Sequence, residues 1–493
     1  MDPLLLIALV VGIAVIVLIV LRTRLDAFVG LLIASVVVGL IAGQDLPAIV
    51  QSIRGGFGST LGSIGIVIGL GVGIGKILEV SGAAEAIAVS FLKVFGKGRE
   101  PWAMTSIGAL ISIPVFCDSG YVITNPLARA IARVRRYGYA VLGIALAGGL
   151  VITHHFVPPT PGPLGVAGIL GASVGSVIVV GLVFTVLMIP VVTFYAKWIG
   201  PKLEDSITEE VQLAVYGDVQ AGREAKVKAM SAGAEDVDFA SVAASSMVNR
   251  EELGAMPKGA KPHNPTTAKG LFPLVLPLLL IVGNTAAEAI DKVNQGWVTG
   301  EAYEASGWAS PFLFFGDPVI ALLIGLVLAV YVLLPRWTPR KNSHKWLSEA
   351  AASAGLIILI TGAGGGLGQV LRDTGIGNAL ADAVSGLALP AFLLPFIIAT
   401  VVRLAQGSGT VSMITAASVT APVMGALDLD PLLAVMACVS GAMVASTFHD
   451  SYFWVVTRFM GLEGKAALKA HTGMTTVMWA ASIPMLFVLS LIL

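Results

Sequence analysis

The chain has 493 residues, of which 56% are hydrophobic and only 12% are charged, with a mean hydropathy of +0.89. Soluble domains carry about 25% charged residues, so this composition excludes an ordinary cytosolic enzyme and a disordered chain. The 30 basic residues cancel the 30 acidic residues, so no excess positive charge is available to attract a nucleic acid. The 57 glycines and 25 prolines in so apolar a chain predict a multi-pass membrane protein with interrupted helices.

Apolar runs of about 20 residues, the length that crosses a membrane, recur along the whole sequence. The first run, residues 4–21, follows an acidic residue and precedes Arg22 and Arg24, so we expect a retained helix with Arg22 in the cytoplasm. Residues 199–268 break the pattern with many acidic residues and few aromatics, which indicates a polar cytoplasmic loop. The sequence therefore predicts two membrane halves, residues 1–198 and 269–493, in the inner (plasma) membrane of the cell.

The two halves resemble each other. Residues 73–82 (GIGKILEVSG) align with residues 366–375 (GLGQVLRDTG), and Thr153 and His155 align with Thr447 and His449. The span that ends near residue 43 has no cation nearby, whereas the corresponding span that ends near residue 334 is followed by four basic residues. Equivalent helices therefore end on opposite sides of the membrane. We predict an all-α polytopic membrane protein built from two inverted repeats, as in many secondary transporters.

Residues 113–126 form the first segment that cannot be a continuous helix. Basic residues flank it on both sides, which predicts a re-entrant hairpin with its tip at Asp118, Ser119 and Gly120. A carboxylate in the middle of a bilayer costs about 3 kcal/mol, so we expect Asp118 to carry a proton or to accept a substrate hydroxyl. The alternative is that Asp118 caps the backbone of its own hairpin.

Residues 401–412 form the second such segment, a matching hairpin that enters from the opposite side. Its free N–H groups, hydroxyls and helix N-termini are suited to an anionic oxygen, and Arg403 adds a clamp for a carboxylate. Alternatively, Arg403 reaches the lipid headgroups or pairs with Asp373 or Asp382. The small residues at both tips also suit close helix packing without a solute.

Residues 153–163 form the third such segment, with four prolines that cannot continue a helix, and residues 446–452 match it in the second half. Histidine beside a carboxylate relays protons in a cavity, so we predict this role for His155, His449 and Asp450. Each histidine is alternatively a structural donor. No HxxxH or HxH spacing is present, so no metal site is predicted.

Four stretches carry a resemblance to a known family: PVFCDSGYV (114–122), HFVPPTPGP (155–163), RLAQGSGTV (403–411) and HDSYFW (449–454). With these the sequence resembles the gluconate:proton symporter family, whose members are gluconate permeases and their relatives, within the wider ion-transporter superfamily. The resemblance implies import of gluconate, related sugar acids, glycerate or D-serine with protons. It also implies paired hairpins, elevator-type movement and a homodimer, without a cofactor. Thr160 stands where the family usually has histidine, so the contacts to the far end of the substrate are expected to differ.

We predict a secondary active transporter, not an enzyme, which imports a small organic anion with protons by elevator-type alternating access. Sodium-coupled carboxylate transport and D-serine-type amino acid:proton symport remain alternatives. A channel and an intramembrane hydrolase are the other rivals, and no GxSxG or HExxH motif supports the hydrolase. The predicted substrate-binding residues are Asp118, Ser119, Gly120, His155, Arg403, Gln406, Gly407, Ser408, Gly409, Thr410 and His449. The predicted proton-coupling residues are Asp118, His155, His449 and Asp450.

Overall fold

The computed structural model describes residues 3–84, 86–87, 90, 95, 98–113, 115–135, 137–216, 253–259, 263–295, 303–376, 390–447 and 450–493. For a few helical residues, among them Ser119 and Gln406, it describes the backbone and not the side chain. The secondary structure of the described residues is helical, without a strand. The prediction of an all-α protein is therefore confirmed.

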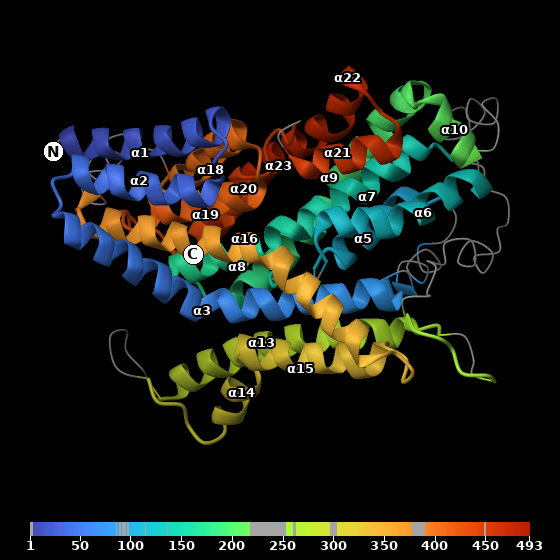
Figure 1. The fold of residues 1–493 in the computed structure, drawn as a ribbon, viewed down its shortest axis with the longest axis horizontal. Coiled ribbons are helices and arrows are strands. Elements are labelled where there is room, and N and C mark those ends of the chain that lie inside the picture. The colour runs from blue at the N-terminus through green and yellow to red at the C-terminus, as the bar shows by residue number, and fades with distance from the viewer. Residues whose placement is uncertain are drawn as a thin grey trace.

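The first part of the chain forms eight described helices (Figure 1). They are α1 (Pro3–Arg22), α2 (Ala27–Ile41), α3 (Leu46–Ser81), α5 (Glu100–Ile111), α6 (Cys117–Arg135), α7 (Tyr139–Phe156), α8 (Pro161–Leu170) and α9 (Val174–Leu203). Residues 112–116 separate α5 from α6, and residues 157–160 separate α7 from α8. Pro158 and Pro159 lie in the second gap and lack the N–H groups that a continuous helix needs.

The second part of the described chain also contains long helices and shorter helices separated by breaks. A short turn (η1, Glu204–Ser206) and α10 (Glu209–Tyr216) follow α9, so the first residues of the predicted polar segment are helical. The helices that follow are α13 (Thr267–Gln295), α14 (Ser310–Phe315), α15 (Pro318–Leu328), η3 (Ala329–Leu333), α16 (Arg340–Asp373), α18 (Leu393–Gln406), α19 (Gly409–Thr420), α20 (Pro431–Gly441), α21 (Ser451–Met460), α22 (Gly464–Ala467), η4 (Leu468–Thr472) and α23 (Gly473–Ser490).

Five helical stretches of the described chain are long and apolar enough to cross a membrane. They are Tyr139–Leu170, Val174–Ser206, Thr267–Gln295, Arg340–Asp373 and Gly464–Ser490. A sixth span results if the two arms of α3, which are bent by 44° near Gly62 and Gly65, are counted as one. These lengths and compositions are those of a multi-pass membrane protein.

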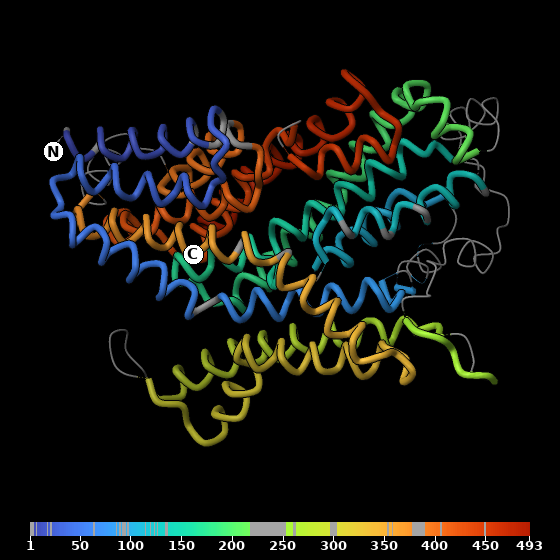
Figure 2. The backbone as a smooth tube through the Cα atoms, in the orientation of Figure 1, coloured from blue at the N-terminus to red at the C-terminus, as the bar shows by residue number. Residues whose placement is uncertain are grey.

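The long helices α3 and α16 pack along each other through the middle of the molecule (Figure 1). Small residues allow this approach: a Cβ atom at Gly56 would lie 2.3 Å from the carbonyl oxygen of Gly365. Helices α13, α14 and α15 lie on one side of this pair, and the helices with interruptions lie on the other (Figure 2). On α3, Lys76 and Glu79 form the ion pair expected from their spacing, at 3.3 Å.

The interrupted helices of the two halves contact each other across the sequence. Helix α19 packs against α8, and α6 packs against α21. The N-terminal ends of α6 and α19 follow the breaks of the two predicted hairpins, whereas α8 and α21 follow the breaks of α7 and α20. This packing between the two parts of the chain brings residues near positions 118, 155, 408 and 450 to one region of the fold.

Candidate functional site

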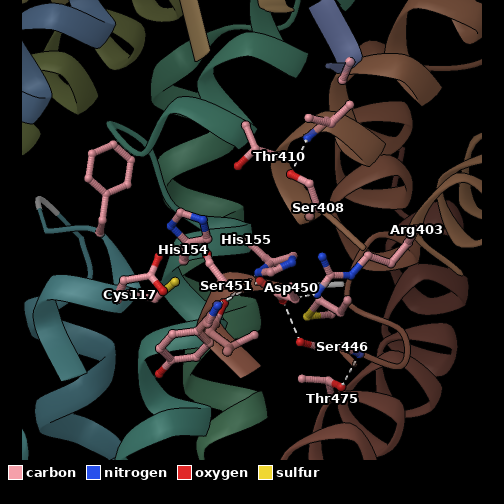
Figure 3. A pocket seen from close by; sticks show the side chains of 18 of the residues that line it. Cys117, His154, His155, Arg403, Ser408, Thr410, Ser446, Asp450, Ser451 and Thr475 are labelled. Carbon is pink, nitrogen blue, oxygen red and sulfur yellow. Dashed lines mark hydrogen bonds and ion pairs between the residues drawn. The ribbon is translucent and has the colours of Figure 1, made fainter. Parts of the chain in front are cut away.

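A cavity of about 410 Å³ lies where these interruptions meet (Figure 3). Its size is suited to a small solute. Its polar lining comes from both halves of the chain, and Asp26 at the turn before α2 also faces it. The lining residues with polar or ionisable side chains are Asp26, Cys117, Asp118, His154, His155, Arg403, Ser408, Thr410, Ser446, Asp450, Ser451, Tyr452, His471 and Thr475.

Besides α2, whose first residue Ala27 lines the cavity and whose end is already capped by Asp26, three helices begin at this cavity. Cys117 starts α6, Gly409 starts α19 and Ser451 starts α21, and all three residues line the cavity. The first N–H groups of a helix have no partner within the helix and carry the positive end of its dipole. Three such ends at one cavity favour a negatively charged group inside it.

Arg403 and Asp450 form a buried ion pair at the centre of the cavity wall. The Arg403 Nη2 atom donates to the Asp450 Oδ2 atom at 2.6 Å, and the two side chains are only 3% and 15% exposed. The Nη1 atom of Arg403 donates to the carbonyl oxygen of Gly407, and its Nε atom has no hydrogen-bond partner among the described residues. Arg403 lies in the last turn of α18, beside the hairpin tip, and is free to donate through Nε.

The Asp450 carboxylate is held by two further donors. Ser446 donates to Oδ2 at 2.6 Å, and the backbone N–H of Tyr452 donates to Oδ1 at 3.1 Å as α21 begins. Asp450 thus caps α21 as well as pairing with Arg403. The Ser446 hydroxyl also lies 3.0 Å from the Nε2 atom of His471, which lies in the π-turn η4.

His154 and His155 reach the cavity from the last turn of α7 (Figure 3). The Nδ1 atom of His155 lies 3.0 Å from the carbonyl oxygen of Val151. A carbonyl can only accept, so Nδ1 carries the hydrogen and Nε2 is left as an acceptor. The Nε2 atom of His155 and the Nδ1 atom of His154 have no hydrogen-bond partner among the described residues. Their rings lie 5.7 Å apart.

Asp118 lies in the first turn of α6, a few residues beyond the break at 112–116. Its Oδ1 atom is buried and has no hydrogen-bond partner in the described part of the chain, and both Asp118 and Ser451 line the cavity. The first turn of α6 and the first turn of α21 therefore both border the cavity. Asp118, which the sequence places at the tip of a hairpin, lines the cavity from the first turn of α6.

The chain turns at Gly407 and Ser408 between α18 and α19, in the second predicted hairpin. Gly407 adopts the left-handed conformation (φ 82°), which glycine tolerates best, and ends α18. Ser408 caps α19 by accepting from the N–H of Val411 at 3.4 Å. A Cβ atom at Gly409 would lie 3.0 Å from Nε2 of His155, so the glycine permits this close approach.

The structure brings most of the predicted residues together. Asp118, His155, Arg403, Ser408, Gly409, Thr410 and Asp450 line the cavity. Gly120 and Gly407 lie beside it and are not among its lining residues. His449 lies outside the described residues, as do the side chains of Ser119 and Gln406.

The sequence reasoning missed His471 and Thr475, which belong to the last helical stretch. Thr475 accepts from the N–H of Ser446 at 3.1 Å, and His471 contacts the Ser446 hydroxyl. The signal in the sequence was a histidine near the start of the last apolar stretch, and the structure buries its side chain fully.

Comparisons with known proteins agree with the geometry. The sequence model described as GntP family permease matches residues 4–235 and 229–492. An uncharacterized permease of Haemophilus influenzae is 39% identical, over 97% of this chain and 90% of its own length. The gluconate permease of Bacillus subtilis is 29% identical, over 99% of this chain and 100% of its own length. Among solved structures, the YdaH transporter of Alcanivorax borkumensis has a similar fold, with a TM-score of 0.55 at 17% identity, over 90% of this chain and 88% of its own.

Proposed function

Because the chain belongs to the GntP family of permeases, we propose that it imports a small hydroxy acid of the gluconate class together with protons. The observation that carries this proposal is the cavity in which three helix N-termini and one arginine meet. Helix N-termini and an unused guanidinium N–H are donors for a carboxylate. The hydroxyls of Ser408, Thr410 and Ser451 are suited to the hydroxyl groups of a sugar acid.

The charges of the cavity favour proton coupling. Arg403 is already neutralised by Asp450, and Asp118 and Asp26 add further negative charge. An anion that entered alone would therefore place uncompensated negative charge inside the membrane, at a cost of several kcal/mol. Protons on Asp118 or on the cavity histidines remove this cost. A loaded, neutral site is then free to move, and an unbalanced site is held back.

The order of elements supports two inverted halves that move as an elevator. A long helix (α3 or α16), a hairpin (α5–α6 or α18–α19), a broken helix (α7–α8 or α20–α21) and a final span (α9 or α23) follow one another in each half. Cross-half packing of α6 on α21 and of α19 on α8 makes the interrupted helices one body around the cavity. We propose that this body slides across the membrane against the rest of the protein.

The proposal also covers the membrane in which the protein lies and its assembly into a homodimer. The halves are residues 1–198 and 269–493, joined by a cytoplasmic loop at 199–268, in the inner (plasma) membrane. The basic residues after η3 and the arginines after α1 are consistent with cytoplasmic ends. The homodimer implied by the family resemblance belongs to the same proposal.

Uptake by the purified protein in liposomes tests this function. With the outside more acidic than the inside, labelled gluconate or a related hydroxy acid is expected to accumulate, and a protonophore is expected to abolish the accumulation. Competition by glycerate, D-serine and other short acids ranks the substrates. Accumulation that ignores the protonophore but disappears when choline replaces Na⁺ would overturn proton coupling in favour of the sodium-coupled alternative.

A further inference from the structure

His471 is buried against the cavity and connected to the central ion pair through a single hydroxyl, that of Ser446. Its Nε2 atom lies 3.0 Å from the Ser446 hydroxyl, which donates to Asp450 at 2.6 Å. A serine has one hydrogen, and the carboxylate can only accept it. The Ser446 oxygen must therefore accept from His471, so Nε2 of His471 carries a hydrogen.

The other ring nitrogen of His471 is consequently the atom that binds or releases a proton. Nδ1 is buried and has no hydrogen-bond partner among the described residues. When His471 is neutral, Nδ1 is an unpaired acceptor beside the cavity, and such a buried group is costly. A proton on Nδ1 makes the ring positive, with the Asp450 carboxylate one hydroxyl away.

The surroundings of His471 include groups that favour a positive charge on its ring and groups that oppose it. Burial of the ring opposes a positive charge on it; of the charged groups that face it, Asp450 favours the proton and Arg403 opposes it. The rings of Tyr452 and Phe453, from α21, pack on it with centroids 5.2 and 5.9 Å away. The ring sits on the π-turn η4, an irregularity that is frequent at functional sites.

We propose that His471 binds a transported proton and that Asp450, which stays paired with Arg403, serves to position it. This inference rests on the proposed symport and deepens it. It reassigns the roles at this end of the cavity: Asp450 has three donors and is poorly placed to be protonated, whereas His471 has a bare nitrogen. The proton moves onto Nδ1 as the anion binds, and it leaves from Nδ1 to cytoplasmic water when the anion is released.

The variant His471→Gln separates these roles, because its amide N–H can still donate to Ser446 but cannot take up a proton. Gluconate counterflow, in which labelled and unlabelled substrate exchange without net proton movement, is expected to persist in this variant. Accumulation driven by a pH gradient is expected to be lost. In titration calorimetry, the slope of log Kd for gluconate against pH should fall by about one, since one proton fewer is linked to binding.

Two further variants keep the test decisive. Ser446→Ala keeps the imidazole but cuts its link to Asp450, so the pH midpoint of gluconate binding should move to lower pH. His344→Gln, at an exposed position on α16, is the matched control and should behave as the wild type. If His471→Gln still accumulates gluconate on a pH gradient, the role of His471 is overturned while symport stands. If the wild-type protein itself shows no proton-driven accumulation, the proposed function fails instead.

Discussion

The Nη2 atom of Arg403 lies 2.6 Å from the Oδ2 atom of Asp450, so one ion pair connects the last turn of α18 to the start of α21. Asp450→Asn should leave a buried, uncompensated guanidinium, which typically costs about 3–5 kcal/mol. We expect a large fall in the thermal unfolding temperature of the detergent-solubilised protein and loss of uptake. The double variant Arg403→Gln with Asp450→Asn should recover much of the stability but not the uptake. An unchanged melting temperature in Asp450→Asn would contradict a structural ion pair.

Asp118 is expected to be needed for proton-driven uptake and not for folding. Asp118→Asn keeps the size of the side chain and removes the site where a proton changes the charge. Its Oδ1 atom has no partner in the described chain, so few hydrogen bonds are lost. Proton-driven accumulation should fall by about 100-fold or more, as expected for a lost proton-transfer group, with the unfolding temperature nearly unchanged. Undiminished proton-coupled uptake would remove Asp118 from this role.

The close approach of Gly409 to His155 predicts that a larger residue at position 409 impairs transport through weaker substrate binding and not through loss of the fold. A methyl group at position 409 would meet the His155 Nε2 atom at 3.0 Å and press on the tip of the hairpin. We expect Gly409→Ala to weaken substrate affinity about tenfold, equivalent to about 1.4 kcal/mol. Gly58→Ala, on exposed α3 backbone with no atom within 4 Å, is the matched control. The control should be neutral or slightly stabilising, because alanine favours a helix by about 1 kcal/mol over glycine.

The interruptions of the helices could be predicted from the sequence because the residues that cause them are local. Prolines 158 and 159, the glycine at 407 and the serine cap at 408 each act on their own turn. The partner of Arg403 could not be predicted this way. The sequence offered Asp373 and Asp382, whereas the structure pairs Arg403 with Asp450, which is 47 residues distant. A pattern within one segment contains no information about which distant segment packs against it.

The role of His471 was hidden for the same reason. Its hydrogen bond to Ser446 spans 25 residues, and nothing adjacent in the sequence marks the contact. The two predicted hairpin segments stand out in the sequence because each contains several unusual residues in a row, whereas His471 belongs to no such run. Such a residue becomes interpretable only when its neighbours in space are known.

The contacts at the N-terminal end of α7 predict a measurable alkaline sensitivity. Tyr216, on α10, donates to the Glu204 carboxylate at 2.5 Å, and that carboxylate also accepts from the N–H groups of Tyr139 and Ala140. Burial and the negative charge of Glu204 raise the pKa of Tyr216 above its usual range. A raised pKa in the fold means that the stabilisation is complete below the ordinary tyrosine pKa of about 10 and is lost as the pH rises above it.

The variant Tyr216→Phe tests this sensitivity. Between about pH 9 and 11 the melting temperature of the wild type should fall more steeply than that of the variant, because only the wild type has the shifted tyrosine. At neutral pH the variant should be less stable by about 1–2 kcal/mol, the cost of a lost hydrogen bond to a charged group. Parallel curves for the two proteins across the alkaline range would argue against the buried contact.

The two cysteines allow the cavity to be probed chemically, because only one of them lines it. Cys117 starts α6 beside Asp118 and faces the cavity, whereas Cys438 is fully buried within α20 and is not a lining residue. A small methanethiosulfonate reagent should therefore inactivate uptake by modifying Cys117, and a saturating substrate should slow the inactivation severalfold by occupying the same space. Cys117→Ala should make transport resistant, while Cys438→Ala should stay as sensitive as the wild type. Resistance that follows Cys438 and not Cys117 would show that the transported anion occupies a different cavity.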